Sequence, residues 1–141
     1  MKLNNTLTMK RKAGMTLLEL TVVILVLLSL ISILFVGARA WKKGSDRSAN
    51  IMNVRNVQQA LRGHQNTRGL LATDTVATTD IFGNSGYLKT PTPPIAGATY
   101  SFGTTYGAPG TLFVTNPDLG GTDGEYFYTS AEITAGKVSD W

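Results

Sequence analysis

The feature of the sequence that most constrains its fold is an uninterrupted apolar run. Residues 20–36 contain no charge and only three polar side chains, those of Thr21, Ser29 and Ser32. Counted from Met15, the segment is about 22 residues long. At a rise of 1.5 Å per residue, such a helix is long enough to cross a hydrocarbon core roughly 30 Å thick. The apolar residues form no one-sided stripe. A helix that is apolar all round belongs in a membrane or deep inside an assembly.

Glu19 is the single charge at the start of this run. A carboxylate deep in a membrane costs on the order of 2–3 kcal/mol on insertion scales, so it needs a proton or a cationic partner. A neutral, hydrogen-bonded carboxyl near the headgroups is one interpretation. The other is that cleavage after Gly14 frees an α-amino group on Met15, one helical turn from Glu19. That amine, on the same or a neighbouring chain, would neutralise the carboxylate.

Residues 14–20 read Gly-Met-Thr-Leu-Leu-Glu-Leu and follow a short leader that contains Lys10-Arg11-Lys12. This pattern resembles the N-terminal motif of type IV prepilins and type II secretion prepseudopilins, with Met15 in place of the common Phe. The resemblance implies removal of residues 1–14 by a prepilin peptidase, N-methylation of Met15, and assembly of a filament through the N-terminal helix. The chain has no cysteine. This favours a pseudopilin, because the C-terminal region of many type IV pilins is closed by a disulfide.

The same resemblance implies a location and a set of partners. The subunit would cross the bacterial inner membrane once with its N-terminus in the cytoplasm, and then join a periplasmic or cell-surface filament. Its partners would be copies of itself, other pilin-like subunits, the peptidase/methyltransferase, an inner-membrane assembly platform and membrane lipid. The leader supplies four of the 13 basic residues, so nine basic residues balance nine acidic ones in the mature chain. The charge therefore predicts no nucleic-acid partner.

Two alternatives remain open. Ala38-Arg39-Ala40 resembles a signal-peptidase site, and cleavage after Ala40 would release a soluble binding module that starts at Trp41. Against this, the apolar run exceeds the usual 7–15 residues, and Glu19 has no function in that scheme. The third possibility is a single-pass membrane protein that never polymerises. Arg39, Lys42, Lys43 and Arg47 flank the far end of the run, so charge bias sets the orientation only weakly.

Beyond the run the pattern becomes amphipathic. Ile51, Val54, Val57 and Leu61 recur at helical spacing and mark one face. We expect an α+β fold, in which one helix from Met15 to about His64 packs its C-terminal half on a small antiparallel sheet. The sheet would use the strand-like runs 99–102, 111–115 and 125–129. The predicted divisions are a leader (1–14), a membrane or filament-core helix (15–37), its amphipathic continuation (38–65) and a loop-rich globular β domain (66–141).

The sequence predicts no enzyme. His64 is the only histidine, no Cys/His set could bind zinc, and we expect His64 to be a capping or surface residue. Three carboxylates in the C-terminal loop, Asp118, Asp123 and Glu125, could supply oxygen ligands to Ca²⁺. The resemblance supports that hypothesis, because major pseudopilins bind calcium in a C-terminal loop. An acidic, solvated turn is the alternative.

Overall fold

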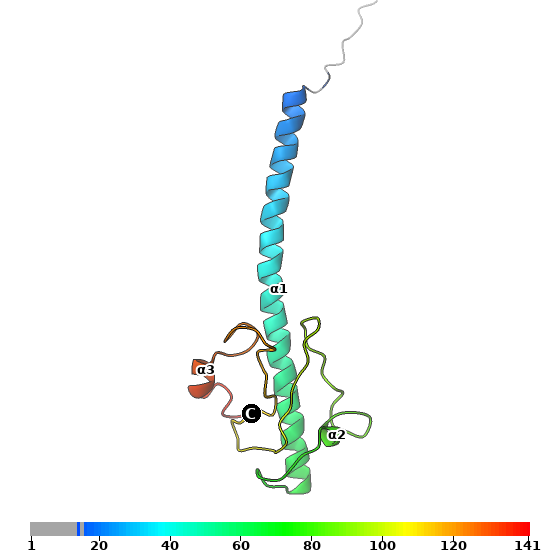
Figure 1. Cartoon of the computed structure of the whole chain (residues 1–141), viewed down its shortest axis with the longest axis vertical. Coiled ribbons are helices and arrows are strands. Elements are labelled where there is room, and N and C mark those ends of the chain that lie inside the picture. The colour runs from blue at the N-terminus through cyan, green and yellow to red at the C-terminus, as the bar shows by residue number, and fades with distance from the viewer. Residues whose placement is uncertain (1–13, 15) are drawn as a thin grey trace, which may run out of the picture. The chain divides into compact units, whose positions relative to one another are not determined.

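The computed structural model describes Gly14 and residues 16–141, and residues 1–13 of the predicted leader and Met15 lie outside the described residues. Three helices occur in the described part: α1 (Leu17–Arg68), α2 (Thr78–Ile81) and α3 (Ser130–Thr134) (Figure 1). The chain divides into two compact units, one that ends at Ala38 and one that spans Arg39–Trp141. The second unit holds the hydrophobic core.

The predicted long helix is confirmed, and α1 runs for 52 residues. It continues four residues beyond the expected end at His64, as far as Arg68. Gly69 follows in a left-handed conformation with φ of 65°, and the Leu70 N–H donates to the Gln65 carbonyl over 3.0 Å. A left-handed glycine closes helices in this way because it has no Cβ to clash.

The amphipathic stripe of α1 is also confirmed. Val54, Val57 and Leu61 are buried, and Ile51 packs against them. Segments that follow Arg68 gather around this part of α1 (Figure 1). They contribute buried side chains that complete the core, namely Val76, Ile81, Phe82, Tyr106, Phe113, Val114, Phe127 and Val138.

The predicted antiparallel sheet is wrong. The described residues contain no sheet, and their strand pairing is limited to isolated bridges such as the antiparallel one between Phe102 and Val114. Two of the expected runs do lie antiparallel there, since the Gly103 N–H donates to the Phe113 carbonyl (2.7 Å) and the Thr115 N–H to the Ser101 carbonyl (2.8 Å). One long helix is the dominant element of the described residues and no sheet packs on it, so the expected α+β class does not describe the protein.

The physical reason lies in where the loop backbone finds its hydrogen bonds. The buried Gln58 side chain accepts from the Phe113 N–H (3.0 Å) and donates to the Thr111 carbonyl (2.9 Å). The buried Asn50 amide donates to the carbonyls of Pro117 and Tyr126, each over 2.7 Å. Side chains of α1 therefore take the place of a neighbouring strand.

Arg62 extends the same arrangement toward the end of α1. Its guanidinium donates to the carbonyls of Gly107 (2.8 Å) and Ala108 (2.7 Å). Gly107 and Gly110 adopt positive φ angles of 68° and 86°, which turn the chain between the two strand-like runs. These two carbonyls are therefore paired with α1 and not with a neighbouring strand.

We predict that Gln58→Leu destabilises the 39–141 unit by about 2–4 kcal/mol, because it leaves the buried Phe113 N–H and the part-buried Thr111 carbonyl without their Gln58 partner. Urea unfolding of a fragment covering residues 39–141 measures the loss. Gln59→Leu is the matched control, since Gln59 is exposed and next in sequence, and it should change stability by less than about 0.5 kcal/mol. Equal effects of the two substitutions would contradict this account of the fold.

Candidate functional site

The first candidate site is the N-terminal end of α1. Gly14 is exposed, and a Cβ built on it would meet no atom within 4 Å among the described residues. Its φ also lies outside the left-handed range that favours glycine. The described fold therefore does not require glycine at this position. Met15, the predicted new N-terminus, lies outside the described residues.

Thr16 and Glu19 form a reciprocal pair of hydrogen bonds at the start of α1. The Thr16 N–H donates to Glu19 Oε2 over 2.8 Å, and the Glu19 N–H donates to Thr16 Oγ1 over 3.3 Å. This is a capping box, which satisfies two of the N–H groups that a helix start leaves free. The carboxylate also lies where the helix dipole favours a negative charge.

The sequence carries a signal for this capping box that the expectations above did not use. Thr16-Leu17-Leu18-Glu19 has the spacing of a capping box directly before an apolar run. Glu19 therefore has a structural function within its own chain. A substitution of Glu19 can therefore act through the capping box as well as through pairing with an amine.

The apolar part of α1 is not buried by any described residue of its own unit. Its most apolar 18-residue window has a mean hydropathy of 3.0, and none of that window is buried. The helix is long and apolar enough to cross a membrane, and a signal sequence near the N-terminus has the same properties. Thr21, Ser29 and Ser32 return their hydroxyl groups to carbonyls of the preceding turn. These polar side chains are thus satisfied within the helix and remain compatible with lipid.

The second candidate site is the acidic loop. Glu125 binds Lys43 of α1 through Oε1 (3.0 Å), while its Oε2 accepts from the Thr122 N–H (3.1 Å). Asp123 Oδ1 accepts from both the N–H and the hydroxyl of Ser130, each over 2.9 Å. Two of the three predicted ligands therefore already have donors from the protein.

Asp118 is different, because its Oδ1 is buried and has no hydrogen-bond partner among the described residues. Burial raises the pKa of this carboxyl, and the nearby Asp123 raises it further, while backbone N–H groups oppose the change. In the part of the chain that the structure describes, no three Asp, Glu, His or Cys side chains form a group that could hold a metal ion.

The calcium hypothesis stays a prediction, since Ca²⁺ would require Asp123 and Glu125 to leave their present partners. It predicts that millimolar Ca²⁺ raises the melting temperature of the 39–141 fragment and that Asp118→Asn removes the increase. Saturation a hundredfold above Kd would add about 2.7 kcal/mol to the stability of the folded state. An unchanged melting temperature would contradict the calcium hypothesis and favour the alternative of an acidic turn without a metal.

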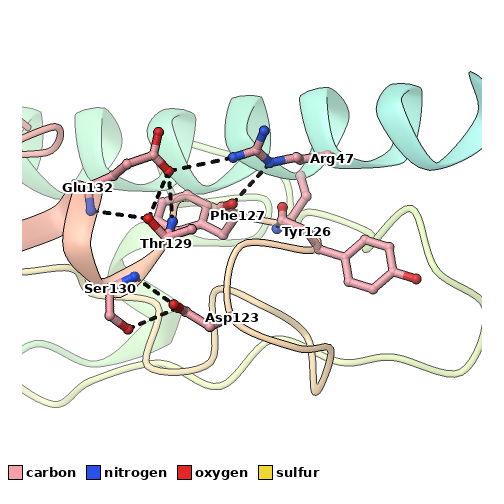
Figure 2. A network of polar contacts seen from close by, with 8 residues as sticks. Arg47, Asp123, Tyr126, Phe127, Thr129, Ser130 and Glu132 are labelled. Atoms are coloured by element: carbon pink, nitrogen blue, oxygen red, sulfur yellow. Dashed lines mark hydrogen bonds and ion pairs between the residues drawn. The ribbon is translucent and has the colours of Figure 1, made fainter.

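A polar network joins α1 to the segment after the acidic loop. Figure 2 shows the Arg47 guanidinium directed at the Glu132 carboxylate and at the Phe127 carbonyl, which accepts from Nε over 3.1 Å. Glu132 also caps α3, because its Oε2 accepts from the Thr129 N–H over 2.9 Å. These bonds, first of all the one from the Thr129 N–H, lower the pKa of Glu132.

His64 is buried, so the expectation of a capping or surface residue is wrong. Only 2% of its surface is exposed. Its Nδ1 shares a hydrogen bond with the Tyr106 hydroxyl, and the Tyr87 ring packs edge-on at 5.3 Å between centroids. His64 lies three residues after Leu61 on the buried face, and this periodicity was the signal that could have placed it in the core.

Comparisons with protein-family models, with curated proteins and with solved structures find no match to the chain.

Glu132 and Asp118, whose pKa values are shifted in opposite directions, predict opposite pH dependence of stability. The pKa of Glu132 lies below its ordinary value of 4.5, so its contribution to stability is present above pH 4.5 and is lost as the pH falls through the lowered pKa. The stability difference between wild type and Glu132→Gln should therefore shrink on acidification.

Asp118 provides the matched comparison. Its pKa is raised above 3.8, so its ionised form opposes folding, and this cost disappears as the pH falls through the raised pKa toward 3.8. Wild type should gain stability relative to Asp118→Asn over that range. Urea unfolding of the three proteins at a series of pH values checks both signs, and parallel pH profiles would contradict both assignments.

Proposed function

We propose that this chain is a structural subunit of a type IV pilus-like filament, most specifically a pseudopilin of a type II secretion system. It is not an enzyme in this proposal. The observation that carries it is the combination at the N-terminus: a glycine that the described fold does not require, then a carboxylate, then an apolar helix whose most apolar window has no buried residue. A basic leader of the prepilin type precedes them.

The exposed helix supports the proposal through the hydrophobic effect. Leu25, Ile33 and Phe35 expose 65–69% of their surface, and each such side chain gains about 1.5–3 kcal/mol when it leaves water. Among the described residues of the first unit, nothing buries them. Lipid would cover this surface before assembly, and the helices of neighbouring copies would cover it in a filament.

Glu19 supports the proposal through charge. Its Oε2 caps Thr16 in the same chain, and a carboxylate can accept further hydrogen bonds from a second donor. Cleavage after Gly14 would create an amine on Met15 close to this carboxylate. In a filament of low dielectric, pairing with the amine of a neighbouring copy gains far more than in water. Only one axial stagger brings the two charges together.

A secreted binding module is the second candidate, and one observation favours it. The compact unit begins at Arg39, one residue before Ala40, the position after which a signal peptidase would cut in this scheme. Against it, residues 38–41 lie within α1, and the helix continues without a break to Arg68. The mature N-terminus separates the candidates, since it would be Met15 for the filament subunit and Trp41 for the secreted module.

Substitution of Glu19 tests the proposal, and the capping box supplies a matched pair of variants. Glutamine retains the box because its side chain also caps at this position, whereas leucine removes both box and charge. Both variants should insert in the membrane and lose the leader normally. Both should yield at least tenfold fewer sheared filaments than wild type, because loss of one partner from a buried charge pair costs about 3–5 kcal/mol.

Normal assembly of Glu19→Gln together with failure of Glu19→Leu would show that the capping box, and not the charge, is what assembly needs. Normal assembly of both variants would overturn the pairing hypothesis. Membrane abundance and mass spectrometry of the mature N-terminus serve as controls in each case.

Processing provides an independent prediction at Gly14. A peptidase pocket that admits only hydrogen before the cleaved bond would reject a larger side chain. Gly14→Val should therefore retain the leader and stay out of filaments. Gly37→Val is the matched control, since a Cβ at Gly37 would likewise meet no atom within 4 Å, and it should be cleaved normally. A shortened chain from Gly14→Val would contradict the assignment.

A further inference from the structure

The segment that follows the apolar run combines an exposed aromatic residue with clustered positive charge. Residues 39–43, which we name the headgroup segment, contain Arg39, Trp41, Lys42 and Lys43. Trp41 exposes 79% of its surface. A large ring left this open in the second unit has no cover within its own fold, in contrast with Trp141, which packs against Phe127.

The positive charges of the headgroup segment are available to an outside partner. Lys42 pairs with Asp46 (2.8 Å) and Lys43 with Glu125 (3.0 Å), but their side chains remain 70% and 67% exposed. Exposed pairs of this kind contribute little and exchange readily. Arg39 makes no ion pair among the residues that the structure describes.

The position of the headgroup segment along α1 predicts where it would lie relative to a membrane. Residues 17–38 rise about 33 Å as a helix, which matches a hydrocarbon core about 30 Å thick. A helix that crosses the membrane therefore reaches the headgroup layer at residues 39–43. Tryptophan concentrates in that layer, where its ring lies among apolar groups while its N–H reaches water. Clustered Lys and Arg next to a membrane span attract anionic lipids.

We propose that the headgroup segment binds the phosphate groups of anionic lipids and that Trp41 lies in the same headgroup layer. The occupant is lipid because three cations complement a phosphate surface, whereas a second copy would bring its own three cations to the contact. The inference rests on the proposed function only in requiring that α1 crosses a membrane. It holds for the free subunit before assembly and does not depend on filament formation.

Tryptophan fluorescence of the full chain in vesicles tests the proposal. Phosphatidylglycerol or phosphatidylcholine, brominated near the top of the acyl chain, serves as the quencher at equal mole fraction in mixed vesicles. The Trp41 signal is obtained from Trp141→Phe and, independently, from the difference between wild type and Trp41→Phe. We expect brominated phosphatidylglycerol to quench Trp41 at least twofold more strongly than brominated phosphatidylcholine, and neither lipid to quench Trp141.

Charge variants identify the ligand groups. Replacing Arg39, Lys42 and Lys43 together by glutamine should reduce the quenching ratio to about one. Arg68→Gln, which removes one charge at the far end of α1, should leave the ratio unchanged. Inorganic phosphate added to the chain in neutral detergent should not alter Trp41 emission, which excludes free phosphate as the ligand.

Each remaining outcome is decisive. Chains that resist an alkaline wash are inserted in the membrane. If neither lipid quenches Trp41 in such chains, the headgroup segment does not lie at the headgroups and the proposal is wrong. Equal quenching by the two lipids also overturns it, because the contact is then apolar only. Release of the chains by the wash would show that α1 does not cross the membrane, which also overturns the proposal. Failure of the wild-type chain to form filaments, together with the expected quenching, would contradict only the proposed function.

Discussion

The fold of residues 39–141 depends on hydrogen bonds between side chains of α1 and the backbone of the loops around it. Buried N–H and C=O groups must be paired, and a chain segment usually meets this demand through a sheet or a helix. Here Gln58 and Asn50 each satisfy two backbone groups from within the apolar face of α1. The loops can therefore remain irregular and still bury their aromatic side chains, but only against this helix.

This dependence explains which part of the fold was predictable. The spacing of Val54, Val57 and Leu61 correctly placed a buried stripe on a long helix, because periodicity reports directly on one face. The sheet was wrong because strand propensity measures how well residues fit a half-buried, extended surface and does not say what pairs with them. Asn50 and Gln58 lie on the same face as the stripe. A polar side chain at a core position was the available signal that α1, and not another strand, would bind the loop backbone.

The candidate sites likewise differ in whether their contacts could be predicted from local sequence spacing. Thr16 and Glu19 interact within one turn, so their capping box could have been predicted from local spacing alone. The ion pair of the acidic loop could not, because the lysine that binds Glu125 comes from a distant part of the sequence. Glu125 meets Lys43 across 82 positions of the chain, and only the folded loop shows that Asp118 is the carboxylate with a buried, unpartnered oxygen.

The two parts of α1 differ in whether residues of the same chain cover their apolar side chains. Substitutions in the two parts should therefore have different effects. Between Leu17 and Val36 the side chains are exposed and make their polar contacts within the helix itself. From Asn50 onward the buried face is covered by the same chain. Substitutions at distant sites without shared partners add independently, so a change in the first part alters what the helix meets outside the chain and leaves the stability of residues 39–141 unchanged. A substitution that abolishes assembly but leaves the stability of residues 39–141 unchanged therefore indicates a lost contact with a partner. A test of the proposed filament subunit must distinguish such a loss from unfolding.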